Sequence, residues 1–231
     1  SLGSYGPSLV IAKRAQAMAG RAMDRTSEAA ALAAIGNLHN IQKQNPEAIN
    51  AFSQSLAVSD AMGNCASTTA TLNALALTQL AMGDERQAAA TLDRATHLAN
   101  QLEMVEYKHH MQARLADSRA RLLLQQGKPG QALIEAQRAL KLHTQAGLFP
   151  NIRARAFTTL AQAHTALGQL PQAIHAYQHQ LDLLSGLNLE PERAQSLYAM
   201  AQLQLRSGDR RAALATINEA IAVVESIRQQ L

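Results

Sequence analysis

Hydrophobic residues recur along this chain at the three- and four-residue spacing of amphipathic helices, as in Ala88, Leu92, Ala95 and Leu98. Each helical stripe follows a short polar hinge, and an alanine lies just after each of five hinges: Ala48, Ala88, Ala132, Ala173 and Ala213. The gaps between these alanines are 40, 44, 41 and 40 residues. A period of this length predicts stacked helical hairpins rather than one globular core.

The hinges contain residues that end one helix and start the next. In Met82-Gly83-Asp84-Glu85, the glycine suits a left-handed C-cap and the aspartate suits an N-cap. Glycine returns at positions 127, 168 and 208, and Pro171 suits a first helical turn. The first hinge, Gln44-Asn45-Pro46-Glu47, lacks the glycine. The longer third interval comes from residues 103–110, which we interpret as an extra helical turn.

The repeated positions resemble those of the tetratricopeptide repeat (TPR) family, over residues 29–231. The family's eighth position, Gly or Ala, corresponds to Gly36, Ala76, Ala120, Ala161 and Ala201. Its twenty-fourth position corresponds to Phe52, Leu92, Ala136, Tyr177 and Ile217. The period near 40 and the triplet Ile35-Gly36-Asn37 are similar to kinesin light chains and Leu-Gly-Asn repeat proteins.

The resemblance implies an all-α fold: a right-handed α-solenoid, or superhelix, of TPR helix hairpins with about 11 helices. We expect residues 1–6 to be a disordered remnant and residues 7–231 to form a single solenoid. Within it, residues 7–28 would be the unpaired helix of a partial repeat. Five repeats would follow, at residues 29–68, 69–112, 113–153, 154–193 and 194–231.

Composition narrows the function classes. The 3% of aromatic residues and the net charge of +4 argue against nucleic-acid binding, which favours dense basic stripes and stacking aromatics. No run of 18 apolar residues occurs, so no membrane span is expected. Cys65 is the only cysteine and cannot form an internal disulfide, which favours a reducing, cytoplasmic location.

The TPR resemblance also implies which side chains of each first helix face the concave groove. These are mostly amides and arginines, which hydrogen-bond to peptide backbones and carboxylates. The sequence therefore predicts binding of a protein or peptide, with a preference for acidic ones; the alternative is that these residues are only the solvated side of each helix. The candidate groove residues are Asn37, Asn40, Asn73, Arg114, Asp117, Arg121, Arg155, Gln162, Tyr198, Gln202 and Arg206.

No catalytic motif is recognisable, and we expect neither an enzyme nor a cofactor. His175 and His179 have the spacing of metal ligands on a helix, but no third ligand lies near them in sequence. Surface histidines without a metal are therefore the expected interpretation. Cys65 has no flanking motif of a catalytic thiol.

Three functional hypotheses stay open. The first is a non-catalytic scaffold that binds a partner in its groove. Residues 220–231 are similar to the helix that joins TPR arrays to caspase-like CHAT peptidase domains, which would make this scaffold the docking or sensing arm of a larger bacterial protein. The alternative is that these residues are a plain terminal helix packed on its own repeat. The second is a ligand-sensing regulatory module, as in bacterial transcription activators. The third, compatible with both, is a homodimer formed through the apolar terminal helices.

Overall fold

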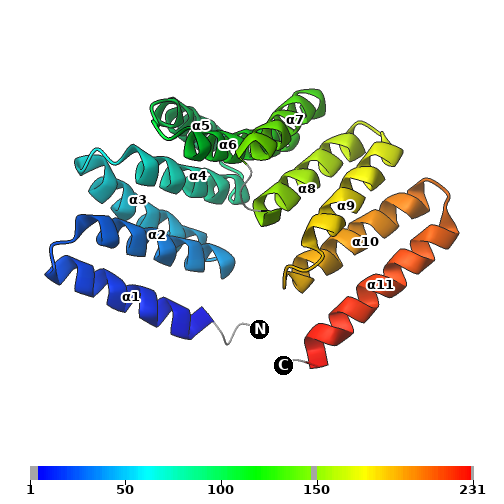
Figure 1. Ribbon diagram of the computed structural model, residues 1–231, viewed down its shortest axis with the longest axis horizontal. Coiled ribbons are helices and arrows are strands. Elements are labelled where there is room, and N and C mark those ends of the chain that lie inside the picture. Colours follow the sequence, from blue (N-terminus) through cyan, green and yellow to red (C-terminus); the bar gives the residue numbers. More distant parts are fainter. Residues whose placement is uncertain (1–4, 147–149, 230–231) are drawn as a thin grey trace. The chain divides into compact units, whose positions relative to one another are not determined.

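A computed structural model describes residues 5–146 and 150–229. Within these ranges the chain forms eleven α-helices and no strand, which confirms the expected all-α fold (Figure 1). The helices are α1 (Tyr5–Arg21), α2 (Arg25–Ile41), α3 (Asn45–Ala61), α4 (Cys65–Ala81), α5 (Glu85–Asn100), α6 (Val105–Gln125), α7 (Pro129–Ala146), α8 (Pro150–Ala166), α9 (Leu170–Leu184), α10 (Glu190–Arg206) and α11 (Arg210–Gln229).

The chain divides into two compact units, Ser1–Ser118 and Arg119–Leu231. In the first unit, α1 to α5 pack consecutively, each helix on the next. In the second unit, α7 to α11 do the same. Each unit is thus a stack of helical hairpins in which neighbours along the chain are neighbours in space (Figure 1).

The hinges confirm the expected helix-ending geometry. Gly83 has a φ of 81° and Gly208 a φ of 90°, values that favour glycine. Asp84 accepts a hydrogen bond from the backbone N–H of Gln87 at 3.1 Å, the arrangement of an N-cap. In the first hinge, which has no glycine, Lys43 takes the left-handed conformation with a φ of 59°.

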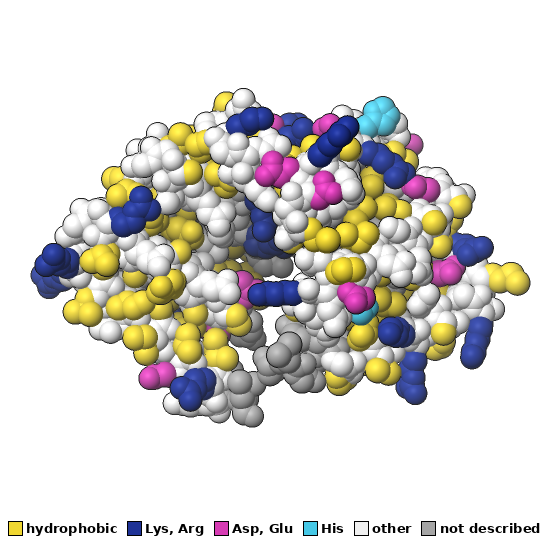
Figure 2. Space-filling view, turned by 180° about the vertical axis from the view of Figure 1, so that it is seen from behind, with side chains coloured by type: hydrophobic (Ala, Val, Ile, Leu, Met, Phe, Trp, Pro, Cys, Tyr) yellow, Lys and Arg dark blue, Asp and Glu magenta, His cyan; other side chains and the backbone are white. Residues whose placement is uncertain are grey.

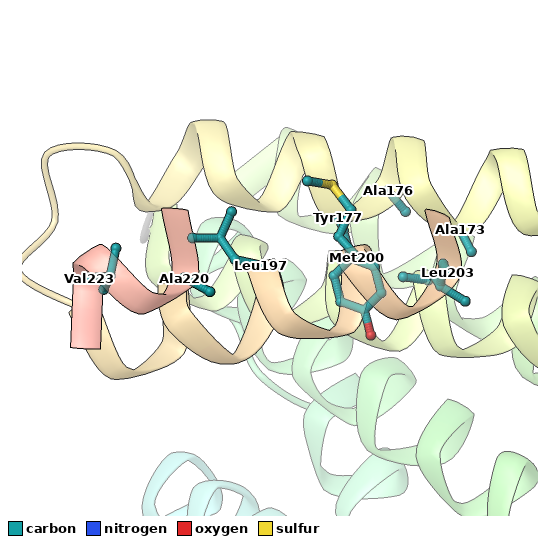
Figure 3. Packing of buried hydrophobic residues seen from close by; sticks show 9 residues of the cluster. Ala173, Ala176, Tyr177, Leu197, Met200, Leu203, Ala220 and Val223 are labelled. Carbon is teal, nitrogen blue, oxygen red and sulfur yellow. The ribbon is translucent and has the colours of Figure 1, made fainter. Parts of the chain in front are cut away.

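Many of the fully buried side chains are alanines. The five hinge alanines, from Ala48 to Ala213, are all buried. At the eighth repeat position, the first repeat has Gly36 where the others have alanine, and the ring of Phe52 fills the space. Phe52 is fully buried, and a Cβ added to Gly36 would lie 2.5 Å from the Cε1 atom of Phe52. In the second unit, Tyr177 packs beside Met200 and Leu203 in a cluster built from α8 to α11 (Figure 3).

The observed helix ends differ from several of the expected boundaries. Helix α1 starts at Tyr5 and ends at Arg21, so it overlaps the segment expected to be disordered and ends before residue 28. Residues 1–4 lie outside the described residues. The first helix of each repeat begins four to eight residues before the expected repeat start, because the N-caps precede the apolar stripes used to place it. The extra turn is confirmed, since α6 has 21 residues where α2, α4, α8 and α10 have 17.

Helix α4 is buried around most of its circumference, with hydroxyl and amide side chains among its leucines. Thr68 donates a hydrogen bond to Oγ of Ser59 at 3.0 Å, while Ser55 on α3 donates to the carbonyl of Ala29 at 2.8 Å. The interior of the first unit is therefore partly polar, and the hydroxyls of Ser55, Ser59 and Thr68 are paired as burial requires.

Candidate functional site

An open hollow of about 530 Å³ lies over helix α9, between the first helices α8 and α10 of two successive hairpins in the second unit. Helices α8 and α10 both pack on α9. They form the two walls of the hollow, and α9 lies at its floor. The lining residues are Gln162, Thr165, Ala166, Tyr177, Ala199, Gln202, Leu203, Leu205 and Arg206.

The walls carry the polar groups of the hollow. Gln162 and Thr165 come from α8, while Gln202 and Arg206 lie one turn apart on α10 and share a face of that helix. The hydroxyl of Thr165 donates to the carbonyl of Ala161 at 2.7 Å, so it is already used within its helix. Two amides and one guanidinium therefore offer the hydrogen bonds, and the lining contains no carboxylate.

The floor of the hollow is apolar. Tyr177 and Leu203 are both buried, and Figure 3 shows the tyrosine ring between α9 and α10, next to Leu203. Burial raises the pKa of the Tyr177 hydroxyl above its ordinary value, because the phenolate would lose its hydration. The hydroxyl is accordingly neutral at physiological pH, and the floor adds no charge.

Three of the residues proposed from sequence meet in this hollow: Gln162, Gln202 and Arg206. Tyr198 is 54% exposed and lies one turn before Gln202 on α10. Arg155 is also exposed, two turns before Gln162 on α8. These five side chains stand on the two helices that form the walls.

The small and apolar part of the lining did not follow from the sequence pattern. Ala166 and Leu205 line the hollow at the ends of α8 and α10, and Tyr177 reaches it from a second helix. Only Tyr177 gave a signal in the sequence, as a large aromatic opposite the small residue Ala161, but that pattern predicts packing rather than exposure to a site.

The other proposed residues lie outside this hollow. Asn37 on α2 is exposed and Asn40 is half-buried. On α6, Arg114 is half-buried and Arg121 is exposed. Their role in binding a partner stays a prediction.

Asn73 and Asp117 are corrections to the expected lining, because both are buried, Asn73 to 2% exposure. The side-chain oxygen of Asn73 accepts a hydrogen bond from the hydroxyl of Ser118 at 2.8 Å. Ser118 belongs to α6, so a position expected to face a groove instead meets a polar partner on another helix in the interior. Neither side chain is accessible to a partner.

We expect Asn73→Ala to lower the free energy of unfolding by about 1–3 kcal/mol, because it leaves the buried Ser118 hydroxyl unpaired. The measurement is urea unfolding followed by circular dichroism. Asn37→Ala is the matched control: the side chain is exposed, and a change within about 0.5 kcal/mol is expected. Equal losses in the two variants would contradict a structural role for Asn73.

Helix α6 also carries a buried histidine, His110. Burial lowers the pKa of His110 below its ordinary value, and the positive charge of Arg114 lowers it further. The imidazole is therefore held in its neutral form, which suits packing more than recognition of an anion.

A second hollow, of about 420 Å³, lies between α8 and α9 and is lined by Phe157, Leu160, His164, Pro171, Gln172, His175, Ala176 and His179. His175 and His179 meet edge to face, with ring centroids 4.4 Å apart, and His179 stacks on Phe157 at 5.4 Å. Over the described ranges, no group of three or more potential ligands could hold a metal ion. The two histidines are exposed and in contact with aromatic neighbours.

Charge is mixed on the face drawn in Figure 2, where basic and acidic side chains are interspersed with hydrophobic ones. Such a surface differs from the continuous basic stripe typical of nucleic-acid binding. In the part of the chain that the structure describes, no helix has both the length and the apolar character needed to cross a bilayer.

A known family matches one part of the chain. The tetratricopeptide repeat family matches residues 152–226, which are the hairpins α8–α9 and α10–α11. No curated protein is significantly similar to the chain in sequence.

Solved structures share the fold at low sequence identity. BtubC (BKLC) from P. vanneervenii has a TM-score of 0.77 at 15% identity, covering 97% of this chain and 92% of that one. A Podosopora anserina chain assigned as a kinesin light chain, with nearly identical TPR-like repeats, has a TM-score of 0.64 at 19% identity, covering 86% and 95%. A Rap protein complexed with competence and sporulation factor has a TM-score of 0.67 at 14% identity, covering 100% and 73%. These likenesses confirm the expected repeat fold.

Proposed function

Because this chain carries tetratricopeptide repeats, we propose that it is a protein-interaction scaffold that binds a segment of a partner protein in the hollow between α8 and α10. The observation that carries the proposal is the composition of that hollow: an apolar floor below walls of amides and one arginine. The structurally similar Rap protein, which is complexed with competence and sporulation factor, supports the idea that such a fold can receive a ligand.

The walls suit an extended peptide. Gln162 and Gln202 each offer both a donor and an acceptor, the combination needed to bond a peptide backbone. An apolar side chain of the peptide would rest on Leu203 and Tyr177 and would be removed from water there. Affinity would come from that buried contact, and orientation from the two amides.

The charge of the lining favours an acidic segment. Arg206 is the single ionisable cation among the lining residues, and no carboxylate there competes for it. A guanidinium can bind a carboxylate through two parallel hydrogen bonds, which fixes both position and direction. Tyr198, exposed on the same helix, adds a rigid aromatic surface of the type that anchors many interfaces.

Amides, one hydroxyl and one guanidinium serve binding rather than bond-making, so we propose no reaction at this site. The scaffold would present its partner to another protein or domain. A place as the docking arm of a larger bacterial protein is part of the same proposal, and it rests on the similarity of the last helix to those preceding CHAT domains.

The test is selection of binders from a phage-displayed library of random short peptides, followed by calorimetry with a selected synthetic peptide. We expect acidic sequences with a central apolar residue to be enriched. Arg206→Glu should weaken binding of the selected peptide about tenfold or more, since it replaces a charge-assisted hydrogen bond by repulsion. Gln202→Trp should also weaken binding, by filling the hollow.

Arg86→Glu is the matched control, because it makes the same charge change on an exposed side chain of α5, outside the hollow. The helical circular dichroism of all variants should be equal. The proposal fails if no peptide is enriched, or if the selected peptide binds the Arg206→Glu and Gln202→Trp variants as well as the original chain.

A further inference from the structure

Helix α11 exposes a row of large aliphatic side chains. Leu214 is 62% exposed, Ile221 is 50% exposed and Val224 is 46% exposed. At 100° per residue these positions share one face of the helix, together with the half-buried Ile217. Exposed aliphatic residues are ordinary when scattered, but a row along one helix indicates a contact surface.

The equivalent positions of α9, in the preceding hairpin, are packed against other residues. The alanines Ala173 and Ala213 are 40 residues apart, so Leu214, Ile221 and Val224 correspond to Ile174, Leu181 and Leu184 of α9. Ile174 and Leu181 pack against the cluster built from α8 to α11, and Leu184 is buried. These positions of the repeat are therefore suited to packing against another helix. On α11 the equivalent side chains are exposed to solvent.

Charges of opposite sign stand at the two ends of this row. Arg210 lies in the first turn of α11 and Glu225 near its end, both exposed and both on the aliphatic face. The helix dipole disfavours both placements, because a cation lies near the positive N-terminal end and an anion near the negative C-terminal end. No ion pair involves either of them among the described residues, whereas Glu219, on another side of the helix, is paired with Arg193 at 2.7 Å.

We propose that this face binds a second copy of the chain, with two α11 helices packed antiparallel about a two-fold axis. If the two-fold axis passes between Ile217 and Asn218, Leu214 of one copy lies opposite Ile221 of the other. This position of the axis also places Arg210 opposite Glu225, twice by symmetry. Arg228, one turn further on, comes near the start of the opposite helix, where Asp209 is the N-cap.

The charge pattern selects this occupant over an unrelated helix. A face with its cation at one end and its anion at the other is complementary to itself only when the two helices run in opposite directions. Within one chain, Arg210 and Glu225 are fifteen residues apart, or roughly 22 Å along a helix, too far to pair. A contact this size, about one 20-residue helix on each side, fits a reversible dimer of modest affinity.

The first test is sedimentation equilibrium over a wide range of protein concentration. We expect the apparent mass to rise from 24.8 kDa towards twice that value as concentration increases. Ile221→Glu should keep the chain monomeric throughout, because it places a charge at the centre of the contact. Ile134→Glu is the matched control: Ile134 is 65% exposed on α7, and its replacement should leave association unchanged.

The second test exchanges the charges. Arg210→Glu alone and Glu225→Arg alone should each weaken dimerisation about tenfold, since each puts like charges together at both ends of the contact. The double variant should dimerise as the original chain does. An equimolar mixture of the two single variants should also associate, because the mixed dimer pairs opposite charges at both ends.

Recovery in the double variant and in the mixture would support antiparallel pairing of α11, and an effect on folding alone could not produce it. A chain that stays monomeric at every concentration would overturn the proposal. So would dimerisation that persists in Ile221→Glu, or dimerisation of the single charge variants equal to that of the original chain. In either of these last two cases the dimer uses another surface.

Discussion

Replacing Phe52 by alanine is expected to lower the free energy of unfolding by about 3–5 kcal/mol. The ring is fully buried between α2 and α3, and it lies directly against the backbone of Gly36. Removing it leaves a cavity that neighbouring helices cannot close without losing their own contacts. Urea unfolding followed by circular dichroism measures the loss, and an unchanged midpoint would show that the ring is not a core contact.

The contact with Gly36 provides an internal control. Gly36→Ala should cost about 1–3 kcal/mol in the original chain, because the added methyl meets the Phe52 ring at 2.5 Å. In the Phe52→Ala background the same methyl has room, and its cost should disappear. A cost of Gly36→Ala that is the same in both backgrounds would mean that the two positions do not interact.

Tyr177→Ala is expected to have a comparable effect in the second unit, again about 3–5 kcal/mol. Tyr177 packs with Leu197, Met200 and Leu203 and separates α9 from α10 at the floor of the hollow (Figure 3). Without the ring, the floor should collapse. Hydrogen exchange read by mass spectrometry should show faster exchange in α8–α10, while α2 and α3 keep their protection.

Tyr177→Phe is the matched control for this loss. It keeps the ring and removes only the hydroxyl, so the stability should stay within about 1.5 kcal/mol of the original. The alanine variant should also bind the selected peptide less tightly, since the floor of its site is gone. If exchange rises equally in both units, stability is shared across the whole chain and the effect cannot be assigned to the hollow.

The repeat framework could be predicted because it depends on local chemistry. A glycine that must adopt a positive φ, an aspartate that caps the next helix and an alanine at the helix contact recur with one period. Each of these requirements acts over a few residues, so spacing alone places them. Three residues of the hollow, Gln162, Gln202 and Arg206, followed from that register.

The remaining features depend on contacts between distant residues. Asn73 looked like a groove residue because its register matched, but Ser118, 45 positions later, pairs with it in the interior. Nothing local distinguishes a polar residue that faces solvent from one that meets a polar partner on another helix. Ser55 is a similar case, because it is buried and its hydroxyl donates to the Ala29 carbonyl on another helix.

The position of Tyr177 in the floor of the hollow makes the site observable without a label. The chain has no tryptophan and four tyrosines, so its near-ultraviolet emission comes from tyrosine alone. Tyr177 lines the hollow, and Tyr198 stands on the same wall helix as Gln202 and Arg206. A peptide that carries a tryptophan and binds there would quench the emission of these two tyrosines by resonance energy transfer, so their fluorescence would report binding of the peptide.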